Sequence, residues 1–478
     1  MILLEQNVND YDYDIRTLIQ AFFDNEKVVL EGEHRLKVKL TVSADGPHHI
    51  SLNDDKGNEI IAKEFYGSHE NKGLRDEVKR QLYDIFSLYH NRKLPWGALT
   101  GIRPVHIVND LVDSGLSYDE CIDTFVNDYR VSHKKAKLSV DVADVERRVL
   151  GDIDYKDAYS LYIGIPFCPT TCLYCSFASY PIKRFNSLVE PYLNALFKEI
   201  DYVASLMKDK KLTSIYIGGG TPTAISDVQI ARLIDKVKSS FDVDGTLEFT
   251  VEAGRPDSIT IDKLKAIYDR GVTRISINPQ TMQDKTLKLI GRQHTVEDFV
   301  NAYNLAREVG FDDINTDLIM GLPDETIDDV EDTLKRISKL KPDNLTIHSL
   351  AIKRAANLNI EMEQYKSHDM GATEEMLDAA YQTAADMNLV PYYLYRQKNI
   401  PGNFENVGFA RVGTEGLYNI LMMEEKQTVL ALGAGTVSKR VYKEGGRIER
   451  IDNVKALDQY ISRIDEMIER KRKLLEGD

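Results

Sequence analysis

Six short apolar segments alternate with helical patterns between residues 159 and 352, and this alternation limits the possible folds more than any other feature. The apolar segments are 160–167, 214–220, 247–253, 274–280, 314–323 and 344–352, and the helical patterns between them include 189–206, 228–241, 295–309 and 327–340. Short strands that alternate with helices form a parallel sheet with right-handed crossovers. Six units are too few for a closed eight-stranded barrel, so the sequence predicts an α/β fold with a partial (β/α)6 barrel. Reactive groups are expected at the carboxyl ends of its strands.

The segments on either side of this alternation have a different texture. Residues 36–42 alternate apolar and polar side chains like a hairpin strand, and a helical pattern follows from Arg75. One face of that helix carries Val78, Leu82, Ile85, Phe86 and Tyr89. We therefore expect an N-terminal α+β domain at 1–155, the barrel at 156–390, and a mixed C-terminal extension at 391–478 that covers the substrate. The tail from Ile451 has the pattern of a charged amphipathic helix.

The composition is typical of a protein that handles small molecules. The formal charge is −15 and the pI about 5.3, so there is no excess of Lys and Arg to neutralise nucleic-acid phosphates. No stretch approaches the ~20 apolar residues of a membrane span, and the first residues lack a basic segment and a cleavage site. We expect a cytoplasmic protein with no nucleic-acid partner and no membrane span.

Three of the four cysteines lie within eight positions, directly after the first predicted strand. Cys168, Cys172 and Cys175 are separated by three and then two residues, and three such thiolates can hold an iron–sulfur cluster with one iron left open. Structural zinc is the first alternative, but it takes four ligands, and no His or fourth Cys lies nearby. Buried structural cysteines are the second alternative, a role that we expect for Cys121, which lies in a helical pattern.

The motif CxxxCxYC after a YxGIPF strand resembles the radical S-adenosylmethionine (SAM) superfamily. The resemblance implies a [4Fe–4S] cluster on the three cysteines, whose open iron binds SAM. One-electron reduction of such a cluster cleaves SAM to methionine and a 5′-deoxyadenosyl radical. The run GGGTPT, with Gly219, Gly220 and Thr221, resembles the motif that holds the amino group of SAM. A phosphate loop is the alternative for this run, but the Lys that such a loop requires is absent.

A longer series of motifs over about residues 158–350 resembles the oxygen-independent coproporphyrinogen III oxidase (HemN-like) branch: YxGIPFC, GGGTPT, VEAGRP, GRQ and DLIMGLP. The resemblance implies two SAM molecules and a set of SAM-binding residues. They are Tyr162, Tyr174, Gly219, Gly220, Thr221, Glu252, Gln280, Arg292 and Asp317. Taken singly, Glu252 could instead lie in a solvated turn, Arg292 in a surface ion pair, and Asp317 at a cap. His294 and His348 are expected to be structural residues with satisfied nitrogens.

Within this branch, the first 150 residues and the segments IHSLAIKR and YYLYRQKNIPGNFENVGFA resemble the coproporphyrinogen dehydrogenases called HemZ. The resemblance implies oxidative decarboxylation of two propionates of coproporphyrinogen III to vinyl groups, which gives protoporphyrinogen IX in anaerobic haem biosynthesis. A flavodoxin- or ferredoxin-type protein would donate the electrons. The four carboxylates of this substrate need cations, and Lys353, Arg354 and Arg396 are the candidates, with a solvated basic patch as the alternative.

Two positions depart from the branch, and two other functions stay open. Gly164 stands where the better-known enzymes have a His, and Phe177 stands where they have a fourth Cys. Neither change removes a cluster ligand. The first alternative function is a haem chaperone of the same branch, whose HNxxYW signature is absent because no Trp follows Trp96. The second is a radical SAM enzyme that acts on another tetrapyrrole.

Overall fold

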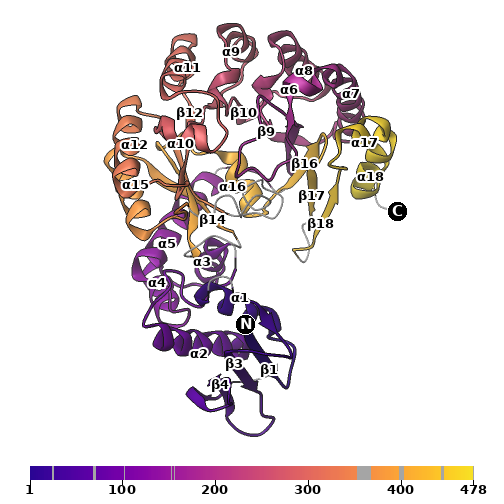
Figure 1. Cartoon of the computed structure of the whole chain (residues 1–478). Coiled ribbons are helices and arrows are strands. Elements are labelled where there is room, and N and C mark those ends of the chain that lie inside the picture. The colour runs from indigo at the N-terminus through magenta and orange to yellow at the C-terminus, as the bar shows by residue number, and fades with distance from the viewer. Residues whose placement is uncertain are drawn as a thin grey trace. The chain divides into compact units, whose positions relative to one another are not determined.

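The structure is a computed structural model that describes residues 1–23, 26–67, 72–101, 103–151, 153–155, 157–351, 368–397, 403–442 and 446–476. Contacts between residues divide the chain into two compact units (Figure 1). The first comprises 1–143 and 395–405, and the second comprises 144–394 and 406–478. None of the helices in the described residues combines the length and the apolar character that a membrane span requires.

The first unit contains a five-stranded sheet in the order β2-β1-β3-β4-β5. Its strands are β1 (Ile2–Gln6), β2 (Val28–Val29), β3 (Leu36–Thr41), β4 (His48–Asp54) and β5 (Glu59–Phe65). Strand β1 is parallel to β2 and β3, whereas β3, β4 and β5 pair antiparallel. Five helices belong wholly or in part to this unit: α1 (Asp12–Phe22), α2 (Lys72–His90), α3 (Pro104–Asp113), α4 (Tyr118–Asn127) and α5 (His133–Gly151).

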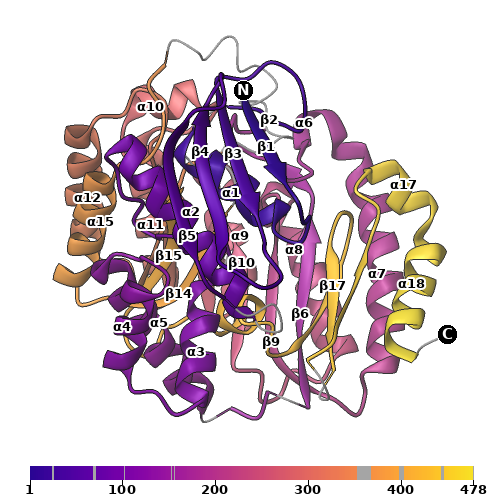
Figure 2. The same cartoon turned by 90° about the horizontal axis from the view of Figure 1, so that it is seen from below.

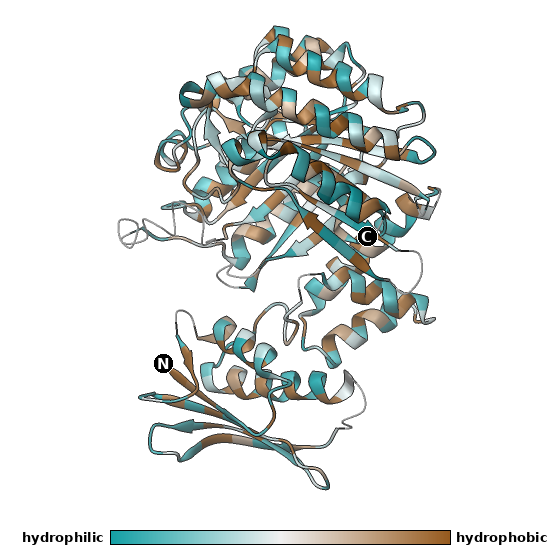
Figure 3. Ribbon diagram, turned by 90° about the vertical axis from the view of Figure 1, so that its right-hand side faces the viewer, coloured by the Kyte–Doolittle hydropathy of each residue, from teal (hydrophilic) through white to brown (hydrophobic). Residues whose placement is uncertain are grey.

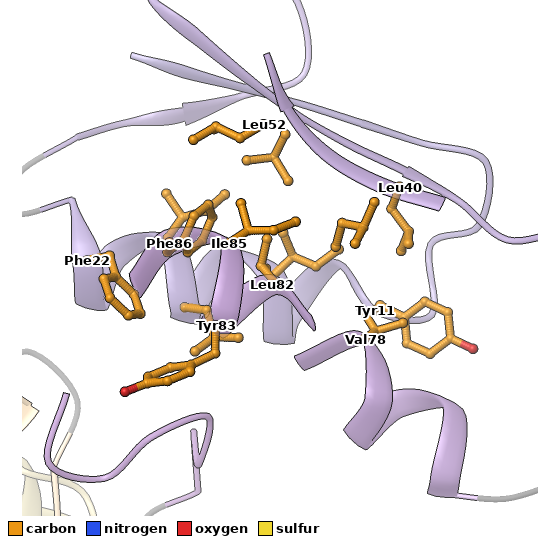
Figure 4. Packing of buried hydrophobic residues seen from close by; sticks show 14 of the residues in the cluster. Tyr11, Phe22, Leu40, Leu52, Val78, Leu82, Tyr83, Ile85 and Phe86 are labelled. Carbon is orange, nitrogen blue, oxygen red and sulfur yellow. The ribbon is translucent and has the colours of Figure 1, made fainter. Parts of the chain in front are cut away.

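The core of the first unit lies between this sheet and helices α1 and α2 (Figure 4). Leu36, Val38 and Leu40 of β3 are buried because alternate side chains of a strand share one face. From α2, Val78, Leu82, Ile85 and Phe86 are buried as predicted. Tyr89 is 36% exposed. It lies in the last turn of α2, where its ring contacts Phe23 and His90 from the edge of the core.

The second unit is built on an 11-stranded sheet in the order β14-β15-β13-β12-β11-β10-β9-β6-β16-β17-β18. The six strands of the barrel are parallel: β6 (Ala158–Ile165), β9 (Lys211–Gly219), β10 (Glu248–Glu252), β11 (Arg274–Ser276), β12 (Ile314–Met320) and β13 (Asn344–Ser349). The helices that follow them are α7 (Val189–Leu206), α8 (Asp227–Ser240), α9 (Ile261–Tyr268), α10 (Asp284–Leu289), α11 (Val296–Val309), α12 (Ile327–Leu340) and α15 (Glu374–Asp386). Figure 1 shows the helices outside the curved sheet. The predicted partial (β/α)6 barrel is confirmed.

Local sequence signals explain these elements. The six parallel strands are almost wholly buried, as expected when helices cover one face and the barrel interior the other. Helices α8, α11 and α12 each begin with a capping box, in which a Ser or Thr and the residue three positions later satisfy each other's backbone donors. Along the helices of Figure 3, hydrophilic and hydrophobic stretches alternate, which is typical of amphipathic helices.

The C-terminal region extends both edges of the barrel sheet. On one edge, β16 (Thr428–Leu432) pairs parallel with β6, and β17 (Val437–Val441) and β18 (Ile448–Asp452) follow antiparallel. On the other edge, β15 (Glu405–Ala410) pairs antiparallel with β13, and β14 (Val390–Arg396) lies beside it. The contact-based units therefore group most of this region with the barrel, and the predicted division at 155 and 390 stays a prediction.

The tail is not one helix from Ile451, as the sequence predicts, because Ile451 lies in β18. Two helices follow, α17 (Leu457–Ser462) and α18 (Ile464–Glu476), and both pack on α7 (Figure 2). The buried carboxylate of Glu199 on α7 accepts hydrogen bonds from the backbone N–H of Gly433, the hydroxyl of Tyr460 and the amide of Asn453, at 2.9, 2.5 and 2.8 Å. The tail therefore fixes the loop after β16 beside the carboxyl end of β6.

Candidate functional site

The three clustered cysteines lie on one loop after β6. Cys168 ends the short strand β7 (Phe167–Cys168), and Cys172 and Cys175 follow. All three are free thiols; the first two are buried and the third is half-buried. Within the described residues, no group of three or more His, Cys, Asp or Glu side chains could hold a metal ion. Each cysteine of a [4Fe–4S] cluster binds a different iron, so its thiolates do not share the coordination sphere of one ion.

Hydrogen bonds tie the cysteine loop to the turn that follows α10. The hydroxyl of Thr170 donates to the carbonyl of Gly291 at 3.1 Å, and the backbone N–H of Leu173 donates to the carbonyl of Ile290 at 3.0 Å. The turn belongs to the segment that carries the GRQ motif. The cysteine loop and this motif are therefore neighbours in space, although more than 100 residues separate them in the chain.

The buried guanidinium of Arg255 lies against the same loop. Its Nη1 is 3.3 Å from the sulfur of Cys172, and its Nη2 donates to the hydroxyl of Thr170 at 3.0 Å. A two-point ion pair with Asp257 holds the other side of the guanidinium. Sequence reasoning missed this residue as part of the site, although it stands in the VEAGRP motif.

The predicted glycine-rich turn after β9 lies beside Cys168. Gly219 has φ +108°, in the left-handed region that favours glycine. A Cβ at Gly220 would lie 2.9 Å from the sulfur of Cys168, so only glycine leaves the sulfur its space. The hydroxyl of Thr221 donates to the same sulfur at 3.5 Å.

Arg292 does not form the surface ion pair that is the alternative for a single arginine. Its side chain is buried, and its guanidinium donates to the hydroxyl of Tyr174 at 3.0 Å. It also donates to the carbonyls of Gly254 and Asn278, both at 2.7 Å. Its Nε has no partner in the described part of the chain. Arg292 thus joins the loops after β10 and β11 to the cysteine loop.

Asp317 lies within β12, and Gln280, which follows β11, lies beside it through a bridge to Leu318. The carboxylate of Asp317 accepts from the amides of Asn278 and Asn315 at 2.8 and 2.7 Å, and His348 lies 3.8 Å away. Burial alone would raise the pKa of Asp317, but the contacts with His348 first, and then with Asn315 and Thr346, hold it below its ordinary value. Gln280 is buried with φ +72°, and its side-chain oxygen has no partner among the described residues. An orphan acceptor beside a carboxylate is typical of a site for a ligand with donors.

Glu252 ends β10 beside a stack of three tyrosines. The hydroxyl of Tyr216 donates to its carboxylate at 2.6 Å. The rings of Tyr162, Tyr216 and Tyr418 stack on one another, with centroids 4.6 to 6.1 Å apart. Burial raises the pKa of Glu252 to about 7, despite the hydrogen bonds from Tyr216 and from the backbone of Gly219. Glu252 is therefore the half-buried last residue of a barrel strand and does not lie in a solvated turn.

A cavity of about 340 Å³ opens beside these groups. Its lining includes Tyr162, Gly164, Phe177, Gly220, Tyr418 and Thr436. The structure explains one departure from the branch, because a Cβ at Gly164 would lie 2.6 Å from the methyl carbon of Thr436. Phe177 is 66% exposed at the cavity, in the position of the missing fourth Cys.

The predicted substrate cations do not gather in the described part of the site. Lys353 and Arg354 lie outside the described residues. Arg396 is buried in the first unit, where it donates to the carbonyl of Leu99 at 2.8 Å and lies over the ring of Trp96. Burial lowers the pKa of Arg396 to about 10. These contacts are those of a structural arginine, and a contact with substrate stays a prediction.

The expected satisfied role of His294 is wrong. Neither ring nitrogen of this buried residue has a partner among the described residues. Burial, and then the charge of Arg292, lower the pKa of His294 to about 3, so the ring is neutral.

The residues of the loop and the strand ends fit a [4Fe–4S] cluster and SAM on three observations. Three free thiols share one loop, Gly220 leaves space beside the sulfur of Cys168, and Gln280 and Asp317 present acceptor oxygens. SAM carries the complementary donors, which are its ammonium group and its ribose hydroxyls. The contacts of individual residues with these cofactors stay predictions.

Comparisons with known proteins decide the family. The pattern of the radical SAM superfamily matches residues 162–337. The oxygen-independent coproporphyrinogen-III oxidase-like protein HemZ of Bacillus subtilis is 40% identical over 85% of this chain and 82% of its own length. The chain belongs to the HemN-like branch of the radical SAM superfamily. The cofactors of this superfamily are a [4Fe–4S] cluster and SAM.

The chain is also similar to a haem chaperone and to a coproporphyrinogen III oxidase. The haem chaperone HemW of Bacillus subtilis is 32% identical over 58% of this chain and 69% of its own length. The structure of coproporphyrinogen III oxidase (HemN) from Escherichia coli superimposes with a TM-score of 0.51, covering 68% of this chain and 73% of that one, at 24% identity. At this identity the superposition shows the fold alone, and it agrees with the partial barrel.

Proposed function

We propose that this radical SAM protein is a coproporphyrinogen III dehydrogenase. It would convert two propionate side chains to vinyl groups and release two molecules of CO2, giving protoporphyrinogen IX. The proposal is supported by the similarity to HemZ over most of both chains. The observation that carries it is that the cysteine loop, the glycine-rich turn and the carboxylate of Glu252 lie at the carboxyl ends of three neighbouring parallel strands, β6, β9 and β10.

We infer that Cys168, Cys172 and Cys175 bind the cluster. When bound, the reduced cluster and SAM supply a 5′-deoxyadenosyl radical that removes a hydrogen atom from the β-carbon of a propionate. The chain's own part is to hold the cofactors and exclude water. The cysteines occupy a loop that Thr170 and Leu173 bind to the neighbouring turn.

Acceptor groups of the chain would orient SAM. The pKa of Asp317 is lowered, so it is an anion at neutral pH that can accept from an ammonium group or from ribose hydroxyls. The unpartnered oxygen of Gln280 adds a second acceptor. Arg292 stiffens the site by joining three loops, and it fixes the hydroxyl of Tyr174. The number of SAM molecules and the identity of the electron donor stay predictions.

Product analysis under anaerobic conditions tests the function. The protein is reconstituted with iron and sulfide, reduced with dithionite, and given SAM and coproporphyrinogen III. We expect protoporphyrinogen IX, with one CO2 and one 5′-deoxyadenosine for each vinyl group. If SAM is cleaved but coproporphyrinogen III stays intact, the cofactor assignment is supported and the substrate assignment is wrong. Another tetrapyrrole would then be the favoured substrate.

A haem chaperone is the second candidate, because HemW is similar to more than half of the chain. The sequence disfavours it, since no Trp follows Trp96 and the HN pair at 90–91 is not followed by YW. Titration of the protein with haem, followed at the Soret band, separates the two. Tight stoichiometric binding together with no turnover of coproporphyrinogen would establish the chaperone.

A further inference from the structure

Arg255 makes an unusual set of contacts for a buried arginine. It is 4% exposed, and one of its terminal nitrogens, Nη1, is directed at the sulfur of Cys172 at 3.3 Å. The same nitrogen is 3.3 Å from the carbonyl of Thr170, and Nη2 is 3.0 Å from the hydroxyl of that residue. A buried guanidinium that donates to a thiol sulfur is a strong electrostatic feature, because few waters screen its charge.

Asp257 fixes the orientation of this guanidinium. Its carboxylate accepts from Nε at 2.9 Å and from Nη2 at 2.8 Å. Such a two-point pair holds the planar group rigidly. Because Asp257 binds the Nε edge, Nη1 is left to face Cys172. Burial would lower the pKa of Arg255, but the hydrogen bond to Asp257 and the charge of Cys172 raise it, so the side chain stays a cation.

The second buried sulfur has a weaker set of donors. Its donors are neutral hydroxyls: that of Thr221 lies 3.5 Å from the sulfur of Cys168, and the side chain of Ser179 also donates to it. Hydrogen bonds to the sulfurs and the net charge nearby are among the factors that set the reduction potential of an iron–sulfur cluster. Reduction adds a negative charge, so a fixed cation beside one ligand sulfur stabilises the reduced state.

We propose that Arg255 is a positioning residue that raises the reduction potential of the cluster through its hydrogen bond to Cys172. Asp257 orients the guanidinium and partly offsets its charge. The reduction potential therefore lies between the value expected without the arginine and the value expected with the arginine but without the aspartate. The proposal rests on the proposed ligation of the cluster by Cys172, and it is independent of the substrate. A weak external reductant could then reduce the cluster to a larger extent than it could without Arg255.

An EPR-monitored redox titration of the reconstituted protein, without coproporphyrinogen, tests the proposal. In Arg255→Gln we expect a more negative midpoint, with a ratio of reduced to oxidised cluster at fixed potential about tenfold lower, which is 59 mV for a one-electron couple. In Asp257→Asn we expect a shift of opposite sign, because the arginine keeps its charge and loses the anion that offsets it. A purely structural role would not give shifts of opposite sign.

Arg270→Gln is a matched control. Arg270 forms the same two-point pair, with Asp235, at 2.9 and 3.0 Å, and no cysteine is among its hydrogen-bond partners in the described residues. The midpoint potential of Arg270→Gln should equal that of the wild type. Arg255→Lys keeps the charge and should recover part of the shift.

The outcomes separate this inference from the proposed function. Equal midpoints of the wild type, Arg255→Gln and Asp257→Asn, at equal iron content, would overturn the inference and leave the cofactor assignment intact. If Arg255→Gln holds no iron, Asp257→Asn decides alone, and an unchanged or more negative midpoint overturns the inference. A wild-type protein with no reducible cluster would overturn the ligation itself, and the inference with it.

Discussion

The four cysteines separate into two kinds by their surroundings. Cys168, Cys172 and Cys175 share the loop after β6, whereas Cys121 is buried in α4 of the first unit. We predict that Ala at any of the three loop positions lowers the iron bound per chain after reconstitution to a small fraction of the wild-type value. Cys121→Ala removes one buried sulfur, so it should cost about 1–2 kcal/mol of stability and leave the iron content unchanged.

Iron and acid-labile sulfide, measured on the anaerobic protein, check this prediction. Circular dichroism spectra before reconstitution show that each variant is folded. Full iron content in a loop variant, or loss of iron in Cys121→Ala, would contradict the proposed ligand set.

From the raised pKa of Glu252 we expect SAM binding to depend on pH. The pKa of its carboxyl is raised to about 7, so the fraction in the carboxylate form falls about tenfold between pH 8 and pH 6. If the carboxylate accepts hydrogen bonds from ribose hydroxyls, the affinity for SAM should fall about tenfold over that range. Calorimetric titrations at several pH values measure this.

Glu252→Gln supplies the comparison for that titration. It should bind SAM more weakly at pH 8 and show a flat profile. A wild-type profile that is also flat would show that ionisation of Glu252 does not contribute to binding.

The sequence identifies several residues of the site but does not predict their hydrogen-bond partners. Motifs identify Arg292 and Asp317, but a partner that they share, Asn278, lies in the loop after β11, distant from both in the sequence. The same holds for Arg255, whose contact with Cys172 spans 83 positions of the chain. A sequence shows which side chains are present, whereas these partnerships depend on the order of strands in the sheet.

At the scale of elements, periodicity located the strands and helices of the barrel well. The predicted helix at 189–206 has the observed bounds of α7, and 327–340 those of α12. Strand ends were less predictable: of the segment 274–280 only 274–276 forms β11, and Gln280, which has a positive φ, makes an isolated bridge to Leu318. The prediction for the tail was wrong because β18 has only five residues, and so short a strand pattern cannot be distinguished from the helical pattern that follows it.

The contact between β6 and the turn after β16 gives an element-scale prediction. Gly164→Ala would bring a Cβ to 2.6 Å from the methyl carbon of Thr436. Such overpacking should destabilise the protein by about 1–3 kcal/mol. Thr436→Ser removes this methyl and keeps the hydroxyl that donates to Gly433.

Thermal unfolding of the single and double variants forms the test. Gly164→Ala should lower the melting temperature less in the Thr436→Ser background than alone. Equal losses in both backgrounds would show that the methyl contact does not require the glycine.

At the scale of the whole molecule, a segment far along the chain completes the first unit. Residues 395–405 group with 1–143. The buried carboxylate of Glu405 accepts from the indole of Trp96 at 2.7 Å and forms an ion pair with the buried ammonium of Lys135 at 2.5 Å. The predicted boundary near 155 was drawn from local composition. Local composition carries no information on the contacts of Glu405 with Trp96 and Lys135, so the sequence could not reveal that 395–405 belongs to the first unit.

A fragment comparison tests this assignment. Residues 1–155 alone lose the carboxylate that faces Lys135, so they should be less stable than the same fragment fused to 395–405 by a flexible linker, by about 3 kcal/mol. Denaturant unfolding of the two fragments measures the difference. In the fused fragment, Glu405→Gln should remove most of the gain, and equal stabilities of all three would contradict the assignment.

We propose that this protein directs a SAM-derived radical at the propionate side chains of coproporphyrinogen III. The most direct measurement uses coproporphyrinogen III deuterated at the propionate β-carbons, with mass spectrometry of the 5′-deoxyadenosine formed. We expect 5′-deoxyadenosine that carries deuterium from the substrate, together with protoporphyrinogen IX. Unlabelled 5′-deoxyadenosine, formed at the same rate with and without the substrate, would contradict it.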